Sequence, residues 1–407
     1  MLSFSFVRFI AMDILGFLLV VGACLALFIL AKRKFGLGKP FIISFCVMLV
    51  GLFLFIFLPQ FGPYSPFPFN MKTFGPSVGP DIPVKNLPRF FKNTFEEVSD
   101  IARDPTDLPP PLTRTTNETV HVNLETKEVI AEIAPGIKYN YWTFDGTVPG
   151  PFIRVLEGDK VELSIKNNPS SIHPHNIDFH ATTGPGGGAT VTTVNPGETK
   201  IFTWKALSPG LYVYHCAHPN VATHMAHGMY GLILVEPKGG LPKVDKEFYI
   251  MQGELYTQGA LGKTGTQIFD ANKMLSGDPQ YIVWNGRIGG TVGTMQANTD
   301  ETVRIFAGNG GVNLISSFHV IGEIFDRVYH EGGIGGLVNK NIQSTLIPAG
   351  GSTIVEFGLE VPGKYILVDH ALSRLDRGAW GTLEVSGEEN KEVFDGVADH
   401  DGKNHGH

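Results

Sequence analysis

The sequence predicts an all-β protein in which two tandem Greek-key β-sandwich domains follow two transmembrane helices. The 407 residues are 43% hydrophobic and 17% charged, so the chain can bury more than one core. Its 49 glycines and 27 prolines are typical of many short strands and turns. Stretches of alternating polar and apolar residues recur twice in the same order beyond residue 113, and two long uncharged stretches precede them.

Residues 1–60 are expected to form a transmembrane helical hairpin. Ile14–Ala31 and Phe41–Leu58 are each eighteen residues without a formal charge, which is about 27 Å of helix. The loop between them is basic, so it should remain in the cytoplasm and return the chain to the outer side. In a cleaved signal peptide the positive charges would come before the apolar run. We therefore expect a multi-pass protein of the inner (cytoplasmic) membrane with its large domains on the periplasmic side.

Residues 61–112 form a proline-rich linker that should act as a spacer. Within it, Phe90, Phe91, Phe95, Val98 and Ile101 recur at nearly helical intervals among charged residues. This spacing predicts a possible amphipathic helix, which would lie on the membrane surface or on the globular body.

Residues 113–240 and 241–386 are expected to be the two sandwich domains. Strand-like alternation covers 121–133, 160–167 and 199–207 in the first domain, and 246–255, 302–311 and 352–361 in the second. Phrases also match in order: LSPGLYVYHCAH in the first half corresponds to VPGKYILVDHAL in the second. The two halves therefore look like a duplicated domain. Residues 387–407, with little apolar content, are expected to be a disordered tail.

Four residues of the first half supply the ligand set of a blue-type copper, which needs a thiolate, two imidazoles and a weak axial thioether. They are His175, Cys216, His224 and Met229. Cys24 and Cys46 lie in the apolar N-terminal stretches, so Cys216 is the single thiol of the remaining chain and cannot belong to a disulfide framework there. The second half has Asp369 and His370 where the first has His215 and Cys216, and without a thiolate it cannot hold a blue site.

Strand geometry separates a second group of side chains from this set. Neighbouring residues of a strand point to opposite faces, so Asp178 and His180 should face away from His175. The same alternation turns His215 away from Cys216. One peptide link would then join two metal sites, which is a short path for an electron from a thiolate copper to an all-imidazole copper.

These motifs resemble those of the copper-containing nitrite reductases, over about residues 115–386. The resemblance is strongest to the branch with a short ligand loop, since His224 lies eight residues after Cys216 and Met229 thirteen after it. It implies two tandem cupredoxin-like domains and two coppers per chain. The implied type 1 copper is bound by His175, Cys216, His224 and Met229, and the implied type 2 copper by His180, His215 and His370.

The resemblance also implies the activity, a one-electron, two-proton reduction of nitrite to nitric oxide and water. The electron would enter at the type 1 copper and pass through Cys216 and His215 to the type 2 copper. Asp178 and His319 match the residues that position nitrite and deliver protons there, and Ile321 matches the residue that crowds the pocket. In the family the second domain offers its histidines across a subunit boundary, so a homotrimer is expected.

Two other functions remain open from the residues alone. A multicopper oxidase shares the repeated sandwiches, but its trinuclear cluster needs an HCH phrase, and the phrase here is HCAH. A membrane-tethered cupredoxin electron carrier would need only the first ligand set and would leave His180, His215, His319 and His370 unexplained. A membrane tether favours a membrane-associated electron donor, such as a cytochrome c, a cupredoxin or a quinol-linked protein.

The remaining features point to no further partner. A formal charge of −7 and a pI near 6.1 argue against nucleic acid, because no basic stripe could neutralise phosphates. We interpret His121, His173, His218, His227 and His330 as surface or hydrogen-bonded residues, although His218 and His227 lie in the ligand loop and could tune the type 1 site. Metal scavenging by the histidines of the tail is a minor possibility.

Overall fold

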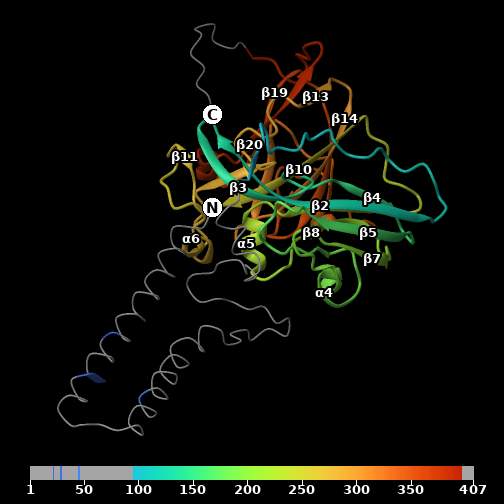
Figure 1. Ribbon diagram of the computed structural model, residues 1–407. Helices are drawn as coiled ribbons and strands as arrows, with labels where there is room; N and C mark the ends of the chain where they lie inside the picture. Colours follow the sequence, from blue (N-terminus) through green and yellow to red (C-terminus); the bar gives the residue numbers. More distant parts are fainter. Residues whose placement is uncertain (1–21, 23–27, 30–44, 46–94, 397–407) are drawn as a thin grey trace.

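The computed structural model describes residues 22, 28, 29, 45 and 95–396, and over this range the protein is built mainly from β-strands (Figure 1). The first sheet has the order β11-β3-β2-β5-β7, with β1 paired to β2, and the second has the order β4-β9-β8-β6. The strands of these two sheets are β1 (Glu96–Glu97), β2 (Thr119–Ala134), β3 (Ile137–Phe144), β4 (Ile153–Leu156), β5 (Lys160–Asn167), β6 (Asp178–Phe179), β7 (Thr199–Lys205), β8 (Gly210–His215), β9 (Tyr230–Glu236) and β11 (Gly265–Thr266).

The next two sheets have the orders β12-β10-β14-β18-β16 and β13-β20-β19-β15-β17. Their strands are β10 (Lys246–Leu255), β12 (Tyr281–Trp284), β13 (Met295–Asn298), β14 (Thr302–Asn309), β15 (Ser316–Ile321), β16 (Arg327–Tyr329), β17 (Thr345–Ile347), β18 (Ser352–Gly358), β19 (Gly363–Asp369) and β20 (Trp380–Ser386). The six stretches of alternating polar and apolar residues named from the sequence fall on β2, β5, β7, β10, β14 and β18.

The internal repeat is visible in the strand pairing. In β3-β2-β5-β7 the successive pairs are antiparallel, parallel and antiparallel, and β12-β10-β14-β18 has the same sequence of pairings. The second sheets also agree, because β4-β9-β8-β6 and β13-β20-β19-β15 both pair parallel, antiparallel and antiparallel. In this alignment β8, which ends at His215, corresponds to β19, which ends at Asp369.

The apolar side chains gather into three cores. One lies inside the first pair of sheets and contains Phe144, Tyr214 and Cys216; another lies inside the second pair and contains Trp284 and Phe318. A third core takes residues from β2, β3, β8, β9, β10, β14 and β18, and therefore joins the two pairs. Strand β9 is buried at every position because it contributes one face to the first core and the other to the third.

Short helices occur in the connections between strands. They are η3 (Pro185–Gly188), α4 (Ala189–Thr192), α5 (Val221–Ala226), α6 (Ala271–Ser276), η4 (His330–Gly332) and η5 (Leu372–Arg377). Helices α5 and α6 lie on the same side of the body (Figure 1), where Ala222 and Met274 pack against the third core. Helix α5 belongs to the loop between β8 and β9 that holds several candidate ligands.

The expected helix of the linker is not formed where the structure describes it. Between residues 95 and 112 the only regular element is β1, which runs parallel to β2 with Glu96 opposite Val129. Ile101 is fully buried in the third core. Pairing with β2 satisfies the backbone of this segment, and the apolar residues anchor it to the body instead of forming a helical stripe.

Other N- and C-terminal expectations fall outside the described residues. These include nearly all of the transmembrane hairpin, Phe90 and Phe91 of the linker, and the tail from residue 397. The residues that the structure does describe include no helix with the length and apolar character needed to cross a membrane.

Two candidate metal centres

The first cluster brings together His175, Cys216 and His224, all of them fully buried. Cys216 Sγ lies 3.3 Å from His224 Nδ1 and 3.9 Å from His175 Nδ1, and the two imidazole nitrogens are 3.2 Å apart. Three of the four predicted type 1 ligands therefore each bring one potential ligand atom to the same point.

Local structure explains how residues distant in sequence reach this point. Cys216 directly follows β8, and the loop then forms α5, whose first turn is capped by the Asn220 side chain accepting from Thr223 N. His224 lies on α5. Met229 returns the chain to Cys216, because Met229 O accepts from Cys216 N at 3.1 Å and Met229 N donates to His224 O at 3.3 Å. Met229 is fully buried in the core that also holds Cys216.

The donor set fits a soft metal ion. Burial raises the pKa of the Cys216 thiol to about 12, although backbone N–H groups of Asn176 and His218 act in the opposite direction. Burial also lowers the pKa of His224 and of His175, so both rings are neutral and offer a lone pair. Two ring nitrogens at 3.2 Å and a buried sulfur next to them are the ligands that copper favours.

The surroundings of this cluster are aromatic and rich in histidine. Trp142 stacks on His227 with ring centroids 4.1 Å apart, contacts His173 at 4.2 Å and meets His224 edge-on at 4.8 Å. Burial lowers the pKa of His227 to about 3, and its Nδ1 lies 2.7 Å from Thr223 O. His227 is therefore a buried, hydrogen-bonded residue of the ligand loop that packs on Trp142.

Four other histidines were interpreted as surface or hydrogen-bonded residues; two of them are exposed, one is buried and one is half-buried. His121 is exposed and lies 3.1 Å from Glu162, and His330 Nε2 is 2.9 Å from the Asn339 amide. His173 is buried, and its Nδ1 lies 3.1 Å from Glu128. His218 contacts His224 with ring centroids 5.6 Å apart.

The second cluster consists of Asp178, His180 and His215. His180 Nε2 and His215 Nε2 are 3.1 Å apart, and Asp178 lies directly opposite His215 in the β6–β8 ladder. The alternation along β8 places Cys216 in the first cluster and His215 in the second, as the sequence predicted. Two of the three predicted type 2 ligands and the predicted catalytic aspartate thus share one face.

A hydrogen bond fixes the orientation of the His215 ring. His215 Nδ1 lies 3.0 Å from Cys216 O, so the N–H at this position donates to the carbonyl and Nε2 is left as the lone-pair nitrogen. Burial, followed by repulsion from His215, lowers the pKa of His180. With their Nε2 atoms 3.1 Å apart, the two rings can both donate a lone pair to one metal ion.

His319, Ile321 and His370 lie elsewhere in the chain. His319 and His370 are neighbours, with ring centroids 5.5 Å apart, on β15 and directly after β19. His319 Nδ1 is 2.5 Å from Gln343 O, and the Ile321 side chain is 39% exposed. His370 does not belong to the group of side chains that meets at His180 and His215. His180 with His215 and His319 with His370 are therefore two separate pairs within one chain.

Three residues beside these clusters were not predicted from the sequence. Glu128 on β2 is fully buried beside His173 and His175. Asp369 accepts from Ser317 N and Ala371 N, and so holds the backbone around His370. Gly187 lies so close to Asp178 that a Cβ there would be 1.7 Å from the Asp178 Oδ1. None of the three belongs to a motif, although Asp369 occupies the position of His215 in the repeat.

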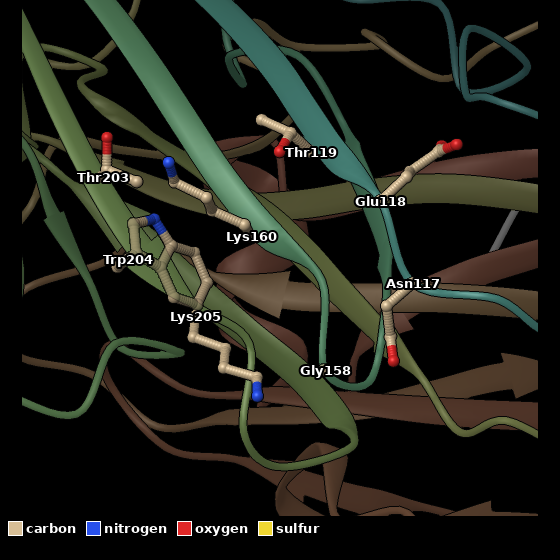
Figure 2. Close-up of a pocket in the computed structure, with 8 residues that line it drawn as sticks. All are labelled: Asn117, Glu118, Thr119, Gly158, Lys160, Thr203, Trp204 and Lys205. Atoms are coloured by element: carbon tan, nitrogen blue, oxygen red, sulfur yellow. The ribbon is translucent and has the colours of Figure 1, made fainter.

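A cavity of about 610 Å³ lies away from both clusters, between the first sheet's strands and the segment before β2 (Figure 2). Its lining includes Glu118, Lys160, Trp204 and Lys205, and it shares no residue with either cluster. It is an open surface hollow and not part of either candidate centre.

Comparison with known proteins relates the chain to copper enzymes. A family model described as multicopper oxidase matches residues 125–240. The copper-containing nitrite reductase of Neisseria meningitidis serogroup A is 56% identical over 291 residues, which cover 71% of this chain and 75% of that protein. A solved copper nitrite reductase from Nitrosomonas europaea has a TM-score of 0.60 at 35% identity and covers 67% of this chain and 96% of its own. A solved multicopper oxidase has a TM-score of 0.57 at 26% identity, with coverage of 70% and 95%.

Proposed function

This chain belongs to the copper-containing nitrite reductases, and we propose that its two clusters are the copper sites of that reaction. The enzyme is copper-dependent and reduces nitrite to nitric oxide, and its all-β fold is cupredoxin-like. The observation that carries the proposal is the pairing of Cys216 in one cluster with its neighbour His215 in the other.

The residues divide between the two sites according to their chemistry. His175, Cys216, His224 and Met229 would hold a type 1 copper, because a thiolate and a thioether suit a site that only transfers electrons. His180 and His215, completed by His370, would hold a type 2 copper, giving two coppers per chain. The type 2 copper would supply a Lewis acid for a nitrite oxygen and the electron for its reduction.

The electron path follows from the covalent structure. Cys216 and His215 are neighbours, and His215 Nδ1 also donates to the carbonyl of Cys216 at 3.0 Å. The covalent path from the Cys216 sulfur to the His215 imidazole thus runs through one peptide unit. The hydrogen bond adds a second connection between the two residues. We infer that reduction begins at the first cluster and ends at the second.

Protons must come from the protein and solvent, since nitrite takes up one electron and two protons to give nitric oxide and water. Asp178 lies within the His180 and His215 group and can bind, orient and protonate an oxygen there. His319, beside His370, is the second proton donor. Ile321, two residues further along β15, would restrict how the substrate lies.

We propose that the type 2 site forms between two copies of this chain in a homotrimer. His180 and His215 present converging nitrogens from the first half, whereas His370 and His319 lie together in the second half. Large apolar side chains are exposed near this second group, among them Ile315 at 53%, Ile321 at 39% and Leu372 at 49%. Contact with another copy would cover them and complete the site.

The apolar segments Ile14–Ala31 and Phe41–Leu58 support a further proposal, that the enzyme is anchored in the inner membrane with its copper sites in the periplasm. A membrane-associated donor, such as a cytochrome c, a cupredoxin or a quinol-linked protein, would then reduce the type 1 site near His224. Deletion of residues 1–60 should lower turnover with membranes as the reductant but not with a soluble chemical reductant. Equal turnover of both proteins with membranes would contradict this arrangement.

A multicopper oxidase is the second candidate, since that family model covers residues 125–240. Such an enzyme needs four coppers per chain, three of them in a cluster built from HxH and HCH phrases. The described residues offer two groups of ligands, one of which holds the single described cysteine. Metal analysis therefore separates the candidates: two coppers per chain support the reductase and four support the oxidase.

The central test is the variant Asp178→Asn. It should retain both coppers and the visible absorption of the thiolate site, while nitrite-dependent nitric oxide formation falls by about 10²-fold or more because a proton donor is lost. Glu162→Gln, which alters a carboxylate on β5 whose described ion-pair partner is His121, is the matched control and should keep full activity. Wild-type turnover by Asp178→Asn with full copper would refute the assigned role.

A further inference from the structure

Glu128 is a buried carboxylate that no part of the proposed reaction uses. It lies on β2, is fully buried, and its Oε1 accepts hydrogen bonds from Ile172 N at 2.8 Å and His173 N at 2.9 Å. Two backbone donors on one oxygen are what an ionised carboxylate accepts readily. The polypeptide thus holds a negative charge in the interior, where solvent and salt screen it little.

This charge faces a ligand of the first cluster. His175 turns its Nδ1 toward Cys216 and His224, and its other ring nitrogen, Nε2, lies 3.5 Å from Glu128 Oε1. That distance is longer than an ordinary hydrogen bond, so the contact is electrostatic. On the opposite side Glu128 Oε2 is 3.1 Å from His173 Nδ1, so the carboxylate lies between two histidines that are two residues apart.

The two imidazoles of the cluster are therefore not equivalent. Neither Nε2 makes a hydrogen bond among the described residues, but a carboxylate oxygen of Glu128 lies 3.5 Å from Nε2 of His175, and no described ion pair involves His224. A metal-bound imidazole that interacts with a carboxylate through its remote nitrogen is held in one orientation and becomes a stronger donor. The asymmetry is built by β2, a strand that contributes no ligand.

We propose that Glu128 is a positioning residue of the type 1 site, which orients His175 and lowers the reduction potential of the bound copper. The inference rests on the proposed function, because it requires copper at His175, Cys216 and His224. Its physical basis is that the oxidised site carries one more positive charge than the reduced site, so a nearby buried negative charge stabilises the oxidised form.

The test is a redox titration of the copper-loaded enzyme, followed through the visible absorption of the thiolate site. Glu128→Gln keeps the shape of the side chain and removes its charge, and its midpoint potential should shift upward from that of the wild type. Asp159→Asn is the matched control: Asp159 is equally buried, accepts from backbone N–H groups and Arg114, and touches neither cluster. Its potential should equal that of the wild type.

An unchanged potential in Glu128→Gln with full copper would overturn the inference, as would an equal upward shift in Asp159→Asn. If Glu128→Gln does not retain copper, pulsed electron paramagnetic resonance of the wild type decides the matter. The remote nitrogens of the two bound imidazoles should then give two distinct nuclear couplings, and identical couplings would overturn the inference. A wild type that shows no thiolate absorption when loaded with copper contradicts the proposed function itself and is distinguishable from both outcomes.

Discussion

Single side chains around the second sandwich show how burial changes protonation. Glu323 follows β15 and is 9% exposed, close to two other carboxyl groups. Burial, followed by the negative charges of Glu360 and Asp326, raises the pKa of Glu323 to about 7, against the effect of a hydrogen bond from Tyr365. At neutral pH this group is therefore only partly ionised.

The sign of the effect on stability follows from linkage. A carboxyl whose pKa is about 7 in the folded state and 4.5 when unfolded stabilises the fold fully below pH 4.5, and this contribution is lost as the pH rises toward 7. Glu323→Gln removes the titration. The Tm of the wild type should therefore fall relative to that of the variant between pH 4.5 and 7. Thermal unfolding at a series of pH values measures this, and parallel Tm curves would contradict it.

Backbone elements, in turn, fix the surroundings of the proposed catalytic residue Asp178. The turn at η3 passes so close to β6 that only glycine fits, since a Cβ at Gly187 would lie 1.7 Å from Asp178 Oδ1 and 3.0 Å from Phe179 O. Gly187 also has a φ of +53°, in the left-handed region. The backbone of this turn therefore confines the Asp178 carboxylate from one side.

Gly187→Ala should disturb Asp178 and lower nitrite turnover while the thiolate absorption of the first site persists. Gly197→Ala is the matched control, because Gly197 has a φ of +85° but no atom within 4 Å of an added Cβ. Both variants bear the backbone strain of roughly 1 kcal/mol, and only Gly187→Ala adds the steric clash. Equal activities of the two variants, measured as nitric oxide formation, would show that the close approach is unimportant.

The end of β19 is organised by another carboxylate. Asp369 is fully buried and accepts from Ser317 N on β15 and Ala371 N, both at 3.1 Å, and from Gln252 Nε2 at 3.1 Å. It also pairs with Arg374. These contacts fix the backbone on both sides of His370.

Asp369→Asn should therefore lower the type 2 copper content and leave the type 1 absorption unchanged, because the ligand His370 loses its support. Glu254→Gln provides the control: Glu254 is 2% exposed and binds the backbone of residues 312–314, but has no bond to the segment around His370. Metal analysis combined with electron paramagnetic resonance distinguishes the two coppers. Full type 2 occupancy in Asp369→Asn would contradict this role.

At the scale of the whole molecule, duplication has produced two halves with the same strand order and different chemistry. The first half carries two converging imidazoles on the face that includes Asp178, and the second carries His319 and His370 together. Three cores tie the halves into one body. In the proposed arrangement, each half would offer a part of the second centre that it cannot complete by itself.

Co-expression of His180→Ala with His370→Ala tests whether copies share this centre. Each variant alone should be inactive. In randomly mixed cyclic oligomers about a quarter of the contacts pair an intact His180 with an intact His370, so roughly that fraction of activity should return. Nitric oxide formation by the co-purified mixture measures it. If the mixture is as inactive as the single variants, the site is not shared between copies.

The sequence predicted those features that depend on local order. Alternation located β2, β5, β7, β10, β14 and β18, and neighbouring positions at the end of β8 separated Cys216 from His215, because a pleated strand fixes the direction of each side chain. The places of His319 and His370 came only from family resemblance. Glu128 could not be predicted, since it lies 44 residues before its partner Ile172 and meets it only when β2 packs. The linker helix was wrong in its described part because pairing with β2 outweighs apolar spacing.

The hydrogen bond from His215 to the Cys216 carbonyl has a consequence for protein engineering. Redesign of the electron-accepting centre by moving the Cys216 backbone would rotate the imidazole of the other centre, and the reverse also applies. In the proposed arrangement, a graft of either centre alone would remove one partner of this hydrogen bond. A successful transplant must carry the end of β8 as an indivisible unit.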